Sequence, residues 1–171
     1  YTIEFWYKSN VSIGTNNPIL TTAGWSSNFL NRWQIVSNSD KIAMWTSNGS
    51  GNTFVGATSL TPGKWYHVAV VQDASSNWKL YLNGELVDTS DNTSTFSGGT
   101  AVRIAAYNNA ANLFNGKIAT AQIYNKILTA AEISTNYYQG PIVTDGLIRA
   151  LDFSNLVCYE SGDSDGSDLT G

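Results

Sequence analysis

Apolar and polar residues alternate along three successive segments in the middle of the chain, and this pattern predicts three consecutive β-strands. The first two segments, residues 65–71 and 78–82, are rich in aromatic and β-branched side chains and are separated by a polar stretch typical of a hairpin loop. Asn83 and Gly84 then separate the second segment from a third, residues 85–87. An Asn-Gly pair supplies the positive φ angles that a type I′ turn requires. We therefore predict an antiparallel β-meander here.

Strand patterns also occur before the meander. Residues 1–8 carry apolar side chains at every second position, which predicts a strand with one buried face. Residues 32–36 and 41–45 flank the polar run Ser-Asn-Ser-Asp, so we predict a second hairpin there.

One short helix is predicted after the last strand-like segment. Thr129 and Glu132 have the spacing of a capping box, in which the hydroxyl accepts a backbone N–H and the carboxylate accepts the N–H of Thr129. We expect Ile133, Tyr137 and Tyr138 to share one face of this helix.

The meander also carries a family resemblance. The motif Trp-x-His-Val-Ala at residues 65–69, followed by a strand that ends Leu-Tyr-Leu-Asn-Gly at residues 80–84, resembles the centre of laminin-G-like, concanavalin A-like domains. The segments that resemble the closing half of such a domain are 102–105, 113–118 and 123–133. The resemblance covers residues 1–140 and implies an all-β fold, an antiparallel β-sandwich of the jelly-roll type with one short helix.

The resemblance also suggests how the chain is divided. We expect residues 1–140 to form a laminin-G-like sandwich that lacks the usual opening strand, which has the form Gly-Leu-x-x-x-Leu-Asp. Residues 146–153, after a break at Pro141, have this form. We interpret residues 141–171 as a linker plus a strand that resembles the opening of a further copy. That strand either completes the sandwich of its own chain or pairs with a neighbouring copy, and tandem copies of this kind resemble those in virion proteins of bacteriophages.

The composition limits the choice of partners. Charged residues make up 13% of the 171 residues, compared with about 25% in ordinary globular proteins, so Asn, Ser, Thr and Gly must form much of the surface. The net charge is −4 and the nine Lys and Arg are scattered, which does not suit a row of phosphates. No apolar run approaches the roughly 20 residues that a membrane-spanning helix needs. We therefore expect neither nucleic acid nor a membrane as a partner.

The carboxylates and the single histidine do not form a catalytic pattern. Glycosidases place two carboxylates on either side of the scissile bond, yet Glu4, Glu85, Glu132 and Glu160 are widely spaced along the chain. We interpret them as surface or capping residues. His67 has no recognisable nucleophile to activate, so we expect it to be a structural, hydrogen-bonded residue. The sequence thus predicts a protein that is not an enzyme.

A metal site is only weakly indicated. Calcium prefers carboxylate and carbonyl oxygens, and the family resemblance implies an acidic residue shortly after residues 113–118. The chain has Ala-Thr-Ala-Gln at residues 119–122 instead. Asp73, Asp88 and Asp91 remain as weak candidates near strand ends. We expect no metal and no cofactor, with calcium left open.

Sugar binding is the remaining chemistry, and it calls for an exposed ring with amide and hydroxyl partners in a loop. Trp25 with Asn28, and Tyr107 with Asn108, have this composition. The alternative is that these rings fill the core or its rim, as large aromatic side chains in strands usually do. The tryptophans for which we favour packing between the sheets are Trp6, Trp33, Trp45, Trp65 and Trp78.

Two classes of function follow. The first is a non-catalytic adhesion or structural module of a larger virion-surface or extracellular protein, which recognises a glycan or a protein on a cell surface and contacts neighbouring copies of the same module. The second is a carbohydrate-binding module appended to a secreted glycoside hydrolase. The fold alone serves both functions equally well.

Overall fold

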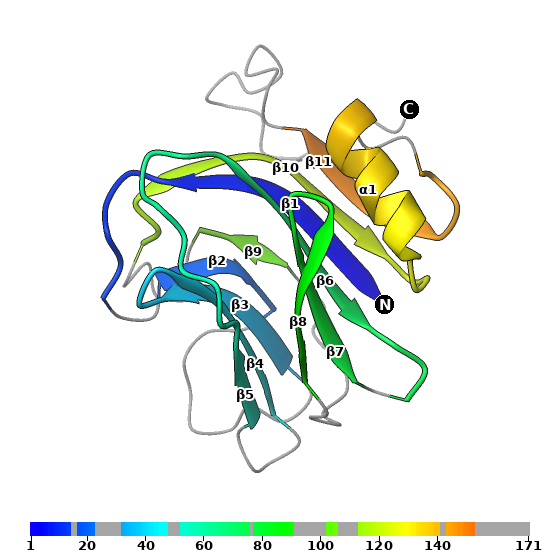
Figure 1. The fold of residues 1–171 in the computed structure, drawn as a ribbon, viewed down its shortest axis with the longest axis horizontal. Coiled ribbons are helices and arrows are strands. Elements are labelled where there is room, and N and C mark those ends of the chain that lie inside the picture. Colours follow the sequence, from blue (N-terminus) through cyan, green and yellow to red (C-terminus); the bar gives the residue numbers. More distant parts are fainter. Residues whose placement is uncertain are drawn as a thin grey trace.

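The computed structural model describes residues 1–14, 17–22, 32–47, 52–75, 77–90, 102–105, 113–140 and 143–152. These residues form two antiparallel β-sheets packed face to face, with one helix on the outside (Figure 1). The elements are β1 (Thr2–Ser9), β2 (Asn17–Thr21), β3 (Arg32–Asn38), β4 (Lys41–Ser47), β5 (Asn52–Val55), β6 (Tyr66–Gln72), β7 (Trp78–Leu82), β8 (Glu85–Ser90), β9 (Arg103–Ile104), β10 (Gly116–Tyr124), α1 (Ala130–Gln139) and β11 (Leu147–Asp152). The predicted all-β sandwich with one short helix is confirmed.

The larger sheet has the strand order β11-β10-β1-β6-β7-β8 and contains the predicted meander. β6 pairs with β7 and β7 pairs with β8, both antiparallel. Asn83 and Gly84 connect β7 to β8 with φ angles of 51° and 81°, so the positive angles predicted for this turn are confirmed.

The smaller sheet has the order β5-β4-β3-β2-β9 and contains the second predicted hairpin. β3 and β4 pair antiparallel from Arg32 opposite Ser47 to Asn38 opposite Lys41. The two turn residues of this hairpin, Ser39 and Asp40, also have positive φ angles of 51° and 57°.

The core lies between the two sheets and is built from the side chains that alternate inward along each strand. On β1 these are the apolar residues at odd positions, whereas Thr2, Glu4 and Trp6 face outward, toward α1 or solvent. The largest buried residues of the main core include Ile3, Phe5, Tyr7, Ile19, Leu20, Ile35, Met44, Trp78 and Leu80.

α1 covers part of the outer face of the larger sheet, next to β10 and β11 (Figure 1). The predicted capping box is present, since Thr129 and Glu132 bond to each other's backbone N–H. Ile133 is buried, but Tyr138 is 74% exposed, so the expectation that Ile133, Tyr137 and Tyr138 share one face is wrong for Tyr138. Ile133 and Tyr138 are five residues apart, which at 3.6 residues per turn places them well over a quarter turn apart.

No helix in the described part of the chain has the length and apolar character to cross a membrane.

β11 is an edge strand of the larger sheet. It pairs antiparallel with β10 of the same chain, from Leu147 opposite Tyr124 to Asp152 opposite Thr120. The strand pattern seen in residues 146–153 therefore forms a strand within its own chain up to Asp152. The division into a module over residues 1–140 and the head of a further copy over residues 141–171 stays a prediction.

Candidate functional site

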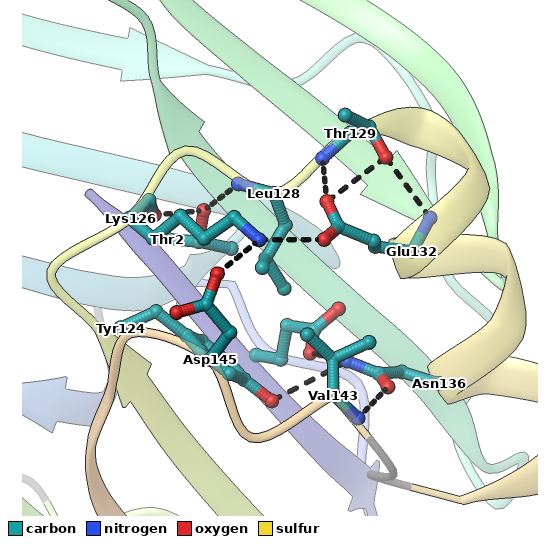
Figure 2. A network of polar contacts seen from close by, with 10 residues as sticks. Thr2, Tyr124, Lys126, Leu128, Thr129, Glu132, Asn136, Val143 and Asp145 are labelled. Carbon is teal, nitrogen blue, oxygen red and sulfur yellow. Dashed lines mark hydrogen bonds and ion pairs between the residues drawn. The ribbon is translucent and has the colours of Figure 1, made fainter.

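Four polar side chains meet between the outer face of the larger sheet and α1. Glu4 comes from β1, His67 from β6, Tyr124 from β10 and Asn136 from α1, and all four are nearly or fully buried. We call them the helix-covered cluster. Figure 2 shows Tyr124 and Asn136 from this group, with Val143 beside them.

Asn136 holds the helix-covered cluster together. Its side-chain amide donates to Glu4 Oε2 at 2.7 Å and to the Tyr124 hydroxyl at 3.3 Å (Figure 2). Its carbonyl oxygen accepts the backbone N–H of Val143 at 3.2 Å. The amide thus links the helix to two strands and to the segment that leads into β11.

On the side of the cluster formed by Glu4 and His67, two polar atoms lack hydrogen-bond partners. Glu4 Oε1 lies 3.8 Å from His67 Nε2, and neither Glu4 Oε1 nor His67 Nδ1 has a hydrogen-bond partner. His67 is buried, as expected of a structural histidine, and its backbone N–H donates to Asn83 Oδ1 at 3.0 Å. Its ring packs against Trp6 and Tyr137, with centroid distances of 5.4 and 5.8 Å.

Burial shifts the ionisation of both groups toward their neutral forms. It raises the pKa of Glu4 to about 7, against the opposing effect of hydrogen bonds from Asn136 and Tyr124. Burial also lowers the pKa of His67 to about 4. The 3.8 Å contact between them is therefore not an ion pair near neutral pH, because His67 is uncharged there.

A carboxyl group with a pKa of about 7 has the ionisation of a general acid, but Glu4 cannot act on a bound molecule. Its side chain is completely covered by the sheet and α1. The expectation that Glu4 is a surface or capping residue is wrong, because α1 folds over the strand position that alternation alone would leave in solvent. The helix-covered cluster is therefore a structural feature that fastens α1.

A second polar group fastens the start of α1. Lys126 Nζ donates to Glu132 Oε1 and to Asp145 Oδ2, both at 2.8 Å, and Glu132 Oε2 accepts the Thr129 N–H at 2.7 Å (Figure 2). The hydrogen bond from Lys126 is the main reason that the pKa of Glu132 falls to about 2. Glu132 is thus confirmed as a capping residue.

The four residues predicted to bind a ligand, Trp25, Asn28, Tyr107 and Asn108, lie outside the described residues. Their assignment stays a prediction. The described residues next to segments 23–31 and 106–112 show which strands these two segments follow.

Both segments begin at neighbouring strands. Thr22, directly after β2, donates its N–H to the Trp33 carbonyl at 3.0 Å, and its hydroxyl accepts the Trp33 N–H at 3.0 Å. Ala105, directly after β9, accepts the N–H of Phe114 at 3.0 Å. β2 and β9 pair with each other at one edge of the smaller sheet. The segments 23–31 and 106–112 therefore leave from adjacent strands.

The metal candidates are only partly described. Asp73 accepts the N–H groups of Ser75 and Asn77 at 2.9 and 3.0 Å, and Asp88 accepts that of Ala57 at 2.7 Å. Both carboxylates thus order loops, and Asp91 lies outside the described residues. Within the described ranges no three His, Cys, Asp or Glu side chains come together as a metal site would require. Calcium binding stays untested.

Comparison with known proteins decides the family. A laminin-G-type family model, described as the concanavalin A-like lectin/glucanases superfamily, matches residues 1–134. The chain belongs to this superfamily. No curated protein matches the sequence at a significant level.

Solved structures share the concanavalin A-like fold at low sequence identity. A candidate carbohydrate-binding protein from Bacteroides ovatus has a TM-score of 0.70 at 17% identity, over 90% of this chain and 45% of that protein. The CBM40 domain of the Ruminococcus gnavus IT-sialidase, bound to α2,3-sialyllactose, has a TM-score of 0.64 at 21% identity, over 78% of this chain and 80% of that domain. Domain 4 of AbnA, an extracellular GH43 arabinanase from Geobacillus stearothermophilus, was solved with arabinotriose and has a TM-score of 0.58 at 19% identity, over 78% of this chain and 64% of that domain. The first similarity spans less than half of the other protein.

The concanavalin A-like chain also exposes an aromatic residue that sequence reasoning placed in the core. Trp65, directly before β6, is 40% exposed, and the ammonium of Lys8 lies 5.5 Å from the centre of its ring. The prediction of packing between the sheets is therefore wrong for Trp65. It is also wrong for Trp6, which stacks on Tyr137 outside the larger sheet, and for Trp45, which packs against Val36 and Ala43 in a separate cluster. Trp33 and Trp78 do lie in the core. One signal was available, because Val68 and Val70 face the core and the odd-numbered position of Trp65 then belongs to the other side of the sheet.

Proposed function

We propose that this chain is a non-catalytic adhesion or structural module of a larger extracellular or virion-surface protein, and that it binds a glycan or a protein on a cell surface. Membership of the lectin/glucanases superfamily over residues 1–134 is the observation that carries this proposal. The sialidase and arabinanase domains of similar fold, solved with sialyllactose and arabinotriose, support a glycan as the ligand. Residues 141–171 would then be a linker plus a strand that resembles the opening of a further copy and completes the sandwich of its own chain.

The binding residues we propose are Trp25, Asn28, Tyr107 and Asn108. The anchors of their two segments lie on paired strands, since β2 pairs with β9. Ala105 donates its N–H to Ile19 at 2.9 Å, and Thr22, directly after β2, is three residues past Ile19, about 10 Å at 3.3 Å per residue. Because β2 and β9 are antiparallel, segments 23–31 and 106–112 start from opposite ends of this pair, and a ligand that contacts both must extend across it.

Binding is tested by titrating the protein with sugars. On a glycan array we expect the chain to retain at least one class of oligosaccharide, and Trp25→Ala and Tyr107→Ala each to weaken binding by roughly tenfold, because an aromatic contact contributes about 1 kcal/mol or more. Tyr1→Ala is the matched control, since Tyr1 is an exposed aromatic residue of the other sheet. An array with no retained sugar, and no cell-surface protein captured, would contradict the proposed function.

We also expect no glycosidase activity. Hydrolysis needs two carboxyl groups that reach the same bond, and Glu4 is covered by α1 while Glu132 is held by Lys126. A panel of polysaccharides and chromogenic glycosides should show no turnover above a buffer blank. Reproducible turnover that disappears when one Glu is changed to Gln would overturn this prediction.

The alternative function is a carbohydrate-binding module appended to a secreted glycoside hydrolase. Its support is that the similar domains from Ruminococcus gnavus and Geobacillus stearothermophilus belong to a sialidase and an arabinanase. The sequence encoded on either side of this chain separates the two functions: a hydrolase domain favours the alternative, and further copies of the module favour the adhesion protein.

A further inference from the structure

Two lysines face each other on the outer surface of the larger sheet. Lys8 of β1 lies directly opposite Lys117 of β10 in the antiparallel ladder, so both side chains emerge on the same face. Like charges in this position repel each other and destabilise the pair. No described carboxylate forms an ion pair with either lysine, because the described ion pairs of lysine involve only Lys79 and Lys126.

Aromatic rings continue from these lysines along the sheet. Lys8 lies over the exposed ring of Trp65, and Trp6 is two residues from Lys8 on β1, about 7 Å away on the same face. Trp6 stacks on Tyr137 of α1, with ring centres 5.6 Å apart and planes 22° from parallel. We call Lys117, Lys8, Trp65, Trp6 and Tyr137 the lysine–aromatic strip.

The combination suits one kind of ligand. Aromatic rings pack against flat, weakly polar groups, and the ammonium groups of Lys8 and Lys117 next to the rings can bind an anion. The chain as a whole has a net charge of −4, so this local pair of cations stands out from its surroundings.

We propose that the lysine–aromatic strip binds a glycan that carries a carboxylate, with the sugar ring against Trp65, whose position is supported by the packed rings of Trp6 and Tyr137, and the carboxylate between Lys8 and Lys117. The choice of a glycan rests on the proposed function. The site is a different one, since the strip lies on the larger sheet and segments 23–31 and 106–112 start from the smaller one. The ligand also relieves the repulsion between the two lysines, so binding is stronger than the exposed charges alone would give.

The test compares acidic and neutral sugars. With α2,3-sialyllactose and trigalacturonic acid as acidic probes and lactose as the neutral one, we expect at least one acidic probe to bind about fivefold or more tightly than lactose, and the difference to shrink as salt is added. Lys8→Gln with Lys117→Gln should abolish the difference. Lys41→Gln is the matched control, because Lys41 is a partly buried lysine of the smaller sheet.

Lys117→Glu separates binding from folding. The new carboxylate would face Lys8 and form a cross-strand ion pair, so the melting temperature should stay the same or rise while the preference for acidic sugars is lost. If the array retains sugars through Trp25 and Tyr107 but the lysine variants keep the acidic preference, the strip is not the site and the proposed function stands. Binding of acidic peptides or anionic vesicles, but not of acidic sugars, would also overturn the inference.

Discussion

Replacing Glu4 with Gln is expected to stabilise the protein progressively, relative to the parent, as the pH rises from 4.5 to 8. The carboxyl group of Glu4 has a pKa of about 7 in the folded chain, compared with an ordinary value of 4.5. Between these values the folded state keeps a proton that the unfolded state has released, so each rise in pH favours unfolding. At about 1.4 kcal/mol per pKa unit, the ionisation of Glu4 lowers the free energy of unfolding by roughly 3 kcal/mol. Glu4→Gln removes this loss.

His67 acts in the opposite direction over part of this range. Its pKa is about 4 in the folded chain and 6.5 ordinarily, so from pH 4 to 6.5 it is the unfolded state that holds the extra proton and stability rises with pH. The two effects oppose each other up to pH 6.5, above which only that of Glu4 continues. The parent should therefore be nearly flat from pH 4.5 to 6.5, whereas Glu4→Gln should rise.

Urea unfolding at half-unit steps from pH 4 to 8 measures this difference. Glu85→Gln is the control for the loss of one negative charge, because Glu85 is exposed at the start of β8. A constant offset between the parent and Glu4→Gln at every pH would show that the carboxyl group is not buried as the structure has it.

Replacing Gly84 with Val is expected to lower the free energy of unfolding by roughly 1–3 kcal/mol. Gly84 has a φ of +81°, which a β-branched residue adopts only with strain. A Cβ there would also lie 3.1 Å from a ring carbon of Tyr137 and 3.3 Å from the Cα of Ser134. The substitution thus disturbs both the turn between β7 and β8 and its contact with α1.

Gly63→Val separates these two causes. Gly63 has the same φ of +81°, but a Cβ there would meet no atom within 4 Å. Thermal and urea unfolding of both variants should therefore show a larger loss for Gly84→Val than for Gly63→Val. Equal losses would mean that the contact with α1 contributes nothing, and an unchanged melting temperature for Gly84→Val would contradict the turn itself.

The features that the sequence predicted well depend on neighbouring residues. Asn83 with Gly84 determines a turn, and Thr129 with Glu132 determines a helix start, without help from the rest of the chain. The sandwich followed from the period of two along the strands and from the family resemblance. Each of these signals acts over a few residues and can be read directly.

The features that were missed depend on which face of a strand another element covers. Glu4 is buried because Asn136, 132 residues later, places α1 over it. Trp65 lies on the outer side of the same sheet and is 40% exposed. Alternation tells the two faces of a strand apart but does not show which outer positions a distant helix will cover. The ligand-binding prediction falls on segments outside the described residues.

The position of β11 also determines how the sandwich would carry a mechanical load. β1 and β11 both run antiparallel to β10, so they run parallel to each other on either side of it. Tension applied at Tyr1 and Asp152 would then pull along the strands, across hydrogen bonds that lie perpendicular to them. Such a load shears the whole row of bonds at once instead of opening them one after another, so strands arranged in this way would resist being pulled apart.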